Sequence, residues 1–140
     1  MKKTILLLFL LLITACTQTN TVCHKDNCFN VELAQTPEEQ ATGLMNRNHM
    51  DDNTGMLFIF KQENIYSFWM KSTLIPLDII WINKNHEVVY ISRDTPAEKD
   101  GKFVNINPEK QALYVLEINA GKSEEIGLKE GDKLELNLIS

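Results

Sequence analysis

DIIWINKNHEVVYIS, residues 78–92, contains two runs rich in isoleucine, valine and aromatic side chains. Runs of this composition favour β-strands, here over residues 78–83 and 88–92. The NKNH segment at residues 83–86 lies between them and is composed of polar, turn-forming residues. Two strands joined by a short turn form a hairpin, so this stretch predicts a sheet built from antiparallel strands.

Further segments on both sides have the same character. Strands are expected over residues 29–34, 56–60, 65–70, 113–118 and 133–138, and a single helical turn over residues 121–126. The sequence therefore predicts an α+β protein that is mainly antiparallel β. We expect a small curled sheet or barrel of six to seven short strands.

One helix is predicted near the start of the folded part. Thr36 is expected to cap it, Pro37 occupies the first helical position, and Glu39 completes a capping box. Apolar residues at positions 41, 44 and 45 then follow helical spacing, which predicts a helix running to about Arg47.

Length and composition limit the classes of protein. A chain of 140 residues with 44% hydrophobic residues should form one folded domain and not a disordered segment. The formal net charge is −5, and removal of Lys2 and Lys3 with a signal segment would leave 12 basic against 19 acidic residues. Nucleic acid is not an expected partner, because binding there depends on many Lys and Arg contacts to phosphate.

The first fifteen residues have the pattern of a signal peptide. A short basic start is followed by nine apolar residues at positions 5–13, fewer than the roughly 20 needed to span a bilayer as a helix. Residues 13–16, ITAC, resemble the bacterial lipobox, which predicts lipidation of Cys16 after cleavage at residue 15. The alternative is an ordinary signal peptide that is cut nearby.

This interpretation divides the chain into three parts. Residues 1–15 form the signal peptide, residues 16–21 the lipidated cysteine with a flexible tether, and residues 22–140 a single globular domain. The predicted protein is exported and held in the cell envelope by lipid on Cys16. Because Thr17 and not Asp follows the cysteine, a Gram-negative cell would place it on the periplasmic face of the outer membrane.

Two cysteines remain after Cys16. Cys23 and Cys28 flank the polar residues 24–27, and an exported protein favours a disulfide between them across a hairpin turn. A redox-active pair or a metal site that includes His24 are alternatives, although one isolated Cys pair lacks the second pair of ligands typical of zinc sites.

Several phrases along the chain occur together in one known family. They are GLMNR at residues 43–47, GMLFIF at 55–60, FWMKST at 68–73, IPLDI at 75–79, YVLEINAG at 114–121 and GD at 131–132. From residue 29 to residue 138 the chain resembles the domain of unknown function 192 family. The resemblance implies a compact, β-rich, often exported domain without implying a reaction. The family more often has Asn where this chain has Ser72.

Asp78 is the first candidate site residue. It lies between Leu77 and Ile79, where a buried carboxylate without a partner would be unfavourable. Arg47 and Lys71 are the expected partners. Asp78 is either an acid, base or ligand-orienting group with a shifted pKa, or a structural residue that forms an ion pair or accepts backbone hydrogen bonds.

The favoured function is a non-catalytic module that binds a ligand or partner. Its cleft would be formed by Arg47, Trp69, Lys71 and Asp78, and the two cations would suit a small polar or anionic ligand. No cofactor and no metal are expected in this case. Oligomeric state does not follow from the sequence, and in the simplest alternative all these motifs only determine the fold.

The first alternative function is an enzyme that acts on envelope polysaccharide. Asp78 and Glu117 would form the carboxylate pair that glycosidases use, with Trp69 or Trp81 as a platform for the sugar. Strand alternation places Glu117 on the face opposite to its neighbours in sequence, where it could equally face solvent.

The second alternative function is copper binding. The thioethers of Met45, Met50, Met56 and Met70, with His49 beside Met50, are ligands that suit Cu(I). Packing of these methionines in the core is the competing interpretation.

Overall fold

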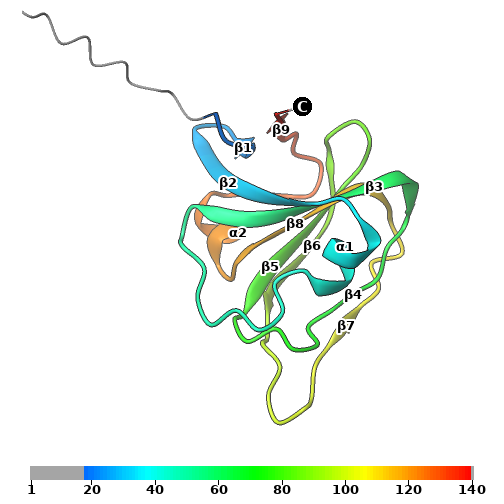
Figure 1. Cartoon of the computed structure of the whole chain (residues 1–140). Coiled ribbons are helices and arrows are strands. Elements are labelled where there is room, and N and C mark those ends of the chain that lie inside the picture. Colours follow the sequence, from blue (N-terminus) through cyan, green and yellow to red (C-terminus); the bar gives the residue numbers. More distant parts are fainter. Residues whose placement is uncertain (1–17, 140) are drawn as a thin grey trace, which may run out of the picture.

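The computed structural model describes residues 18–139. The predicted signal peptide and the predicted lipidation site, Cys16, lie outside the described residues. Seven strands form one sheet and two more form a short separate ribbon (Figure 1). The sheet contains β1 (Thr21–His24), β2 (Asn27–Ala34), β3 (Thr54–Ile65), β5 (Leu77–Ile82), β6 (Val88–Thr95), β8 (Gln111–Asn119) and β9 (Glu135–Asn137). The ribbon contains β4 (Phe68–Trp69) and β7 (Asn105–Ile106), and the helices are α1 (Pro37–Thr42) and α2 (Lys122–Glu125).

The strand order in the large sheet is β6-β5-β8-β3-β2-β1-β9. All neighbours are antiparallel except β2 and β3, which are parallel because α1 carries the chain from one to the other. The predicted α+β class with mainly antiparallel strands is thus confirmed, and the sheet curls into a half-barrel. The predicted hairpin in residues 78–92 is present as β5 and β6.

The two ends of the curled sheet meet through the segment that precedes β9. The amide of Leu134 donates to the carbonyl oxygen of His86 at 2.9 Å, and the amide of Val88 donates to that of Asp132 at 2.9 Å. These bonds attach residues 131–134 to the start of β6, so the sheet edges are joined at this end of the barrel.

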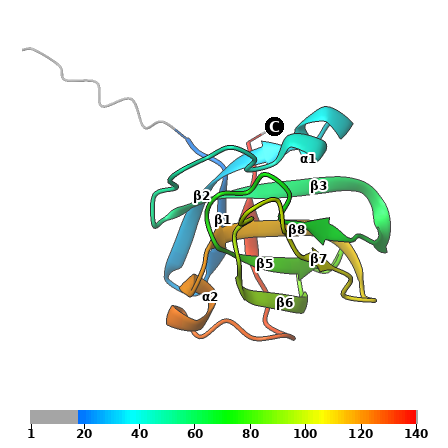
Figure 2. The ribbon, with the colours of Figure 1, turned by 90° about the horizontal axis from the view of Figure 1, so that it is seen from below.

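Each face of the sheet carries its own hydrophobic core. The inner core packs side chains inside the curl, among them Val22, Leu57, Ile80 and Ile118. The outer core lies between the other face and a covering layer made by α1, β4, β7 and their connections. Figure 2 shows β3, β8, β5 and β6 in succession with β4 and β7 lying over them. Because β5 is covered on both faces, all six of its residues are buried.

Helix α1 is shorter than the sequence predicts. Its capping box is present as expected, with the Thr36 hydroxyl accepting from the amide of Glu39 and the Glu39 carboxylate accepting from the amide of Thr36. The predicted extension to Arg47 is wrong. Gly43 ends the helix with φ +46°, and a Cβ there would lie 3.1 Å from the ring of Phe58.

The predicted strand over residues 65–70 is also mostly wrong. Strand β3 continues to Ile65 across an irregularity between Ile59 and Asn64, and only Phe68 and Trp69 form a strand afterwards. The irregularity bends the chain, so that the following residues cross over the outer face and do not extend the sheet.

The N-terminal hairpin is close to the prediction. Cys23 and Cys28 pair in register across the β1–β2 turn and form a disulfide. Part of the segment predicted as a flexible tether contacts the domain, because the Thr19 hydroxyl bonds to Asn30 and the Asn20 carbonyl accepts from the amide of Val31. Residues 19–21 therefore belong to the folded domain.

Candidate functional site

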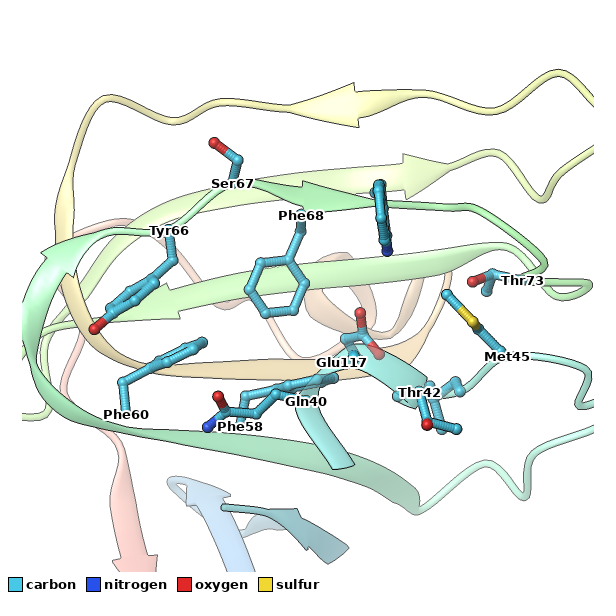
Figure 3. Close-up of a pocket in the computed structure, with 14 residues that line it drawn as sticks. Gln40, Thr42, Met45, Phe58, Phe60, Tyr66, Ser67, Phe68, Thr73 and Glu117 are labelled. Atoms are coloured by element: carbon cyan, nitrogen blue, oxygen red, sulfur yellow. The ribbon is translucent and has the colours of Figure 1, made fainter. Parts of the chain in front are cut away.

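A pocket of about 140 Å³ lies between the outer face of the sheet and its covering layer. It is lined by Gln40, Ala41, Thr42, Gly43, Leu44, Met45, Phe58, Phe60, Tyr66, Ser67, Phe68, Trp69, Thr73 and Glu117. Figure 3 shows the Glu117 carboxyl in the middle of this group, with Phe68 on one side and Gln40 and Thr42 on another. We call this hollow the Glu117 pocket.

Helix α1 and the turn after it form one wall. The Gln40 amide nitrogen donates to the carbonyl of Ile59 at 2.8 Å and to that of Ala34 at 3.3 Å, which fixes the helix against β2 and β3. Gly43 lets the turn approach the ring of Phe58. Ala41 and Thr42 are exposed at the opening, so this wall is reachable from solvent.

Aromatic side chains form the opposite wall. The rings of Phe60 and Tyr66 stack with centroids 3.6 Å apart, and Phe68 lies edge-on to Phe58 at 4.9 Å. The indole nitrogen of Trp81 donates to the carbonyl of Tyr66 at 2.8 Å and holds the segment in place. Burial raises the pKa of the Tyr66 phenol, so this ring is neutral at physiological pH.

Glu117 forms the floor. Its register partners are Met56 on β3 and Ile79 on β5, and only 5% of its surface is exposed. Gly55 allows β3 to approach this part of β8, since a Cβ there would lie 2.5 Å from the carbonyl oxygen of Glu117. Within residues 18–139 the Glu117 carboxyl has no hydrogen-bond or ion-pair partner. Burial raises its pKa to about 8.

Trp69 stands at the mouth of the pocket. Half of its surface is exposed, its ring packs edge-on to Phe103 with centroids 6.3 Å apart, and the Lys71 ammonium lies 5.5 Å from its ring centroid. Trp69, which the sequence offers as a candidate ligand-binding residue, thus lines the Glu117 pocket.

Asp78 lies on the other face of the sheet. It pairs in register with Ile118, whereas Glu117 pairs with Ile79, so the two carboxyls point to opposite sides. Asp78 is fully buried, and its two oxygens accept from the amides of Asp94 and Ser123 at 2.8 Å each. The prediction that Arg47 and Lys71 pair with Asp78 is therefore wrong. The alternative, in which Asp78 accepts backbone hydrogen bonds, is the arrangement present.

Arg47 is held elsewhere as well. Its guanidinium forms a two-point ion pair with Glu32 on β2, at 2.5 and 2.7 Å, and it does not line the Glu117 pocket. The structure thus brings Trp69 and Lys71 together, but it separates them from Arg47 and Asp78. The predicted pairing of Asp78 with Glu117 as two carboxylates on one substrate does not occur in this geometry.

The methionines pack in the protein. Met50, Met56 and Met70 belong to the outer core, while His49 is exposed and contacts Asp51 at 3.0 Å. Met45 lines the Glu117 pocket. In the described part of the chain no cluster of three or more His, Cys, Asp or Glu side chains is arranged to hold a metal ion.

The chemistry of the pocket is that of one acidic group among aromatic rings and uncharged polar side chains. Its lining residues include a single carboxyl and no histidine, cysteine, lysine or arginine. A carboxyl that lies at the floor of an open pocket and whose pKa is raised by burial is typical of functional sites. This arrangement can bind a group that pairs with a carboxyl and can hold an apolar body beside it.

Sequence reasoning identified Glu117 and Trp69 but not the pocket they share. Gln40, Phe58, Phe60, Tyr66 and Phe68 were not expected at a site. Phe58, Phe60 and Phe68 lie within the phrases that carry the family resemblance, which is a signal in their favour, whereas Gln40 and Tyr66 had none.

The family model for the domain of unknown function 192, described as an uncharacterised ACR family, matches residues 19–136. The chain belongs to this family. None of the curated proteins matches it. Membership agrees with the phrases noted in the sequence, of which GLMNR and GMLFIF each supply residues of the Glu117 pocket.

Two solved structures are similar to this member of the family. A protein of unknown function from Novosphingobium aromaticivorans is 37% identical with a TM-score of 0.72, over 84% of this chain and 83% of that one. A protein from Sinorhizobium meliloti, described as a candidate transcription regulator, is 30% identical with a TM-score of 0.72, over 84% of this chain and 91% of that one.

The disulfide indicates an extracytoplasmic location, since disulfides persist in oxidising compartments. Among residues 18–139, none of the helices has the length and apolar character needed to cross a membrane.

Proposed function

We propose that the protein is a lipid-anchored envelope module that binds a small ligand in the Glu117 pocket without catalysing a reaction. The observation that carries the proposal is the carboxyl of Glu117. It is 5% exposed, lies at the floor of an open pocket, and has no partner within the described residues. A buried polar group in a folded protein normally has a hydrogen-bond partner, and here the open pocket supplies that partner as water or as a ligand that displaces the water.

The composition of the lining favours binding over catalysis. The glycosidase alternative needs a second carboxyl beside Glu117, and Asp78, the carboxyl that the sequence offered for this role, points to the opposite face. The walls combine aromatic rings with uncharged polar side chains such as Gln40, Thr42 and Thr73, and small-molecule pockets use such polar groups to orient a ligand.

The anchor of the proposal is Cys16. Its support is the signal-like segment and the ITAC phrase in the sequence, together with the extracytoplasmic location indicated by the disulfide. Because residues 19–21 belong to the fold, only two residues separate Cys16 from the domain, which would then lie directly at the membrane. In a Gram-negative cell the proposed position is the periplasmic face of the outer membrane.

The test uses the full chain, produced with its own signal segment and extracted from membranes with detergent. Saturation-transfer NMR against a library of small soluble fragments is expected to detect binders that are lost in Ala41→Trp, because the new indole at this exposed position fills the mouth of the pocket. Glu38→Trp is the matched control, since Glu38 is exposed on the same helix and does not line the pocket.

Fragments that bind the native and Glu38→Trp proteins but not Ala41→Trp support the proposal. A library that gives identical results for all three proteins refutes the pocket as the site. In the same preparation Cys16→Ser is expected to move the protein from the membrane fraction to the soluble fraction. Retention of that variant in the membrane would refute the lipid anchor.

A further inference from the structure

We infer that the ligand of the Glu117 pocket carries an organic ammonium group, which is seated against the Glu117 carboxyl and among the surrounding aromatic rings. This inference rests on the proposed binding function and adds the chemical class of the ligand. It is drawn from three features of the pocket: the sign of the available charge, the nature of the walls, and the size of the space.

The charge that the lining can offer to a ligand is negative, and it is present once Glu117 ionises above its raised pKa. Glu117 is the single carboxyl of the lining, which has no Arg or Lys to balance it. An anionic ligand would meet a carboxyl with no cation beside it, which is unfavourable in a buried site. A cationic ligand instead supplies the partner that the carboxyl lacks within the described residues, and the pair gains strength because Glu117 is only 5% exposed.

The walls are suited to the same ligand. Phe58, Phe60, Tyr66, Phe68 and Trp69 all line the pocket. Aromatic faces are negative at their centres and attract cations, and sites of this kind hold ammonium groups in other proteins. Trp69 already has an ammonium near its ring, that of Lys71 at 5.5 Å from the centroid.

The space fits a compact group. A cavity of about 150 Å³ holds one benzene molecule, and the Glu117 pocket measures about 140 Å³. A quaternary or substituted ammonium with a few carbon atoms is of this size. Longer parts of a ligand would leave through the mouth beside Ala41 and Trp69.

Few groups around the pocket titrate. Met56 and Ile79 flank Glu117 on the sheet, and Gln40, Thr42 and Thr73 approach from the covering layer, all without titratable side chains. Tyr66 is the other titratable group in the lining, and burial raises its pKa further above neutrality. The Lys71 ammonium lies at the rim and opposes a cationic ligand. Glu98 contacts the turn at Ser72 and Thr73 and lies outside the lining. A change in affinity near pH 8 therefore reports on Glu117.

The test compares three compounds of similar shape: tetramethylammonium, tert-butanol and pivalate. They are cationic, neutral and anionic respectively, and the cation keeps its charge at every pH. The chain has two tryptophans, so ¹⁵N-labelled full-length protein gives two indole signals, which Trp69→Phe assigns. Trp69 reports on the pocket, and Trp81, which is buried and bonded to Tyr66, serves as the internal reference.

Tetramethylammonium is expected to shift the Trp69 signal and to bind most tightly of the three at pH 9. Since only the ionised carboxyl pairs with it, and burial raises the pKa of Glu117 to about 8, its affinity should fall roughly 100-fold between pH 9 and pH 6. Glu117→Gln keeps the shape of the side chain and is expected to weaken tetramethylammonium at least tenfold at pH 9 and to abolish the pH dependence.

The outcomes separate this inference from the proposed function. If tert-butanol or pivalate binds at least as tightly as tetramethylammonium at pH 9, and Ala41→Trp abolishes that binding, the pocket is a ligand site but the ammonium inference is wrong. Unchanged tetramethylammonium affinity in Glu117→Gln would also overturn it. If none of the compounds and no fragment of the library distinguishes the native protein from Ala41→Trp, both proposals fail.

Discussion

Asp78 and Glu117 are two buried carboxyls on adjacent strands of one sheet, and their surroundings are opposite. Asp78 faces the inner side and accepts two backbone amides, from Asp94 and Ser123. Glu117 faces the outer side and has no partner within the described residues, while a pocket opens beside it. The hydrogen bonds of Asp78 hold the end of β6 and the start of α2 to β5, so its role is structural.

Burial alone therefore does not determine the chemical state of a carboxyl in this sheet. What separates the two residues is whether the protein itself satisfies the charged form. Donors aimed at Asp78 compensate its removal from water, whereas Glu117 is removed from water without donors, and its pKa rises to about 8. The Glu117 carboxyl, without a donor inside the protein, remains able to pair with a group that enters the pocket.

The largest expected effect is the loss of stability on removing Asp78. Asp78→Ala leaves the amides of Asp94 and Ser123 without acceptors, and hydrogen bonds to charged groups contribute about 1.5–3 kcal/mol each. We expect the free energy of unfolding to fall by about 3–5 kcal/mol, measured by urea denaturation at pH 7.

Asp52→Ala is the control for that substitution. Asp52 is exposed and pairs with Lys122 of α2 at 3.2 Å, so the loss should stay below about 1 kcal/mol. If Asp78→Ala is no more destabilising than Asp52→Ala, the structural role assigned to Asp78 is wrong.

The second effect has the opposite sign and concerns Glu117. Its ordinary pKa of 4.5 applies to the unfolded chain, and burial raises the folded value to about 8. Between these values the folded state holds a proton that the unfolded state has lost, so the stability of the native protein falls as the pH rises. Glu117→Gln removes the loss of stability that comes from ionising the buried carboxyl. This substitution should stabilise the protein by about 3 kcal/mol at pH 7, with no difference at pH 4.

Urea denaturation across pH 4–8 measures the effect. Glu38→Gln changes an exposed glutamate on α1 and should follow the native curve. A Glu117→Gln protein that is less stable than the native one at pH 7 would mean that the carboxylate is satisfied inside the protein, and the contrast with Asp78 would disappear.

The smallest effect concerns the turn beside the Glu117 pocket. Ser72 has φ +54°, a region in which Asn is tolerated better than Ser, and its amide donates to Glu98 at 2.6 Å. Ser72→Asn restores the residue more often found in the family and should raise the free energy of unfolding by roughly 0.5 kcal/mol.

Ser67→Asn is the matched control for stability, because Ser67 has no positive φ. It should leave stability unchanged. Ser72→Asn should also keep the ligand affinity of the pocket, since Ser72 does not line it. Loss of binding in Ser72→Asn alone would show that the strained turn belongs to the site.

Much of the fold could be predicted from local patterns. The β5–β6 hairpin, the capping box at Thr36 and the Cys23–Cys28 disulfide depend on residues close together in the chain, and each is present. The end of α1 was missed because it depends on Gly43, whose left-handed backbone and contact with Phe58 are not visible in an apolar spacing pattern.

The site was predicted only in part, for a related reason. Strand alternation correctly placed Glu117 on the face opposite to Leu116 and Ile118, but it could not tell what covers that face. In the strand that carries Asp78 every residue is buried, so alternation gave no information about its surroundings. Arg47 was expected beside Asp78 and instead pairs with Glu32 on β2.

Most strands of the large sheet, the helix start, the disulfide and the family could be predicted from the sequence, because these follow from neighbouring residues or from phrases that recur together. The tertiary structure was needed to show that backbone amides bind the buried carboxyl of Asp78, whereas that of Glu117 faces a pocket with aromatic rings. The physical reason is that the environment of a side chain is made by segments distant in the chain. Here α1 and the β4 segment cover the outer face of the sheet, and their packing gives Glu117 its pocket.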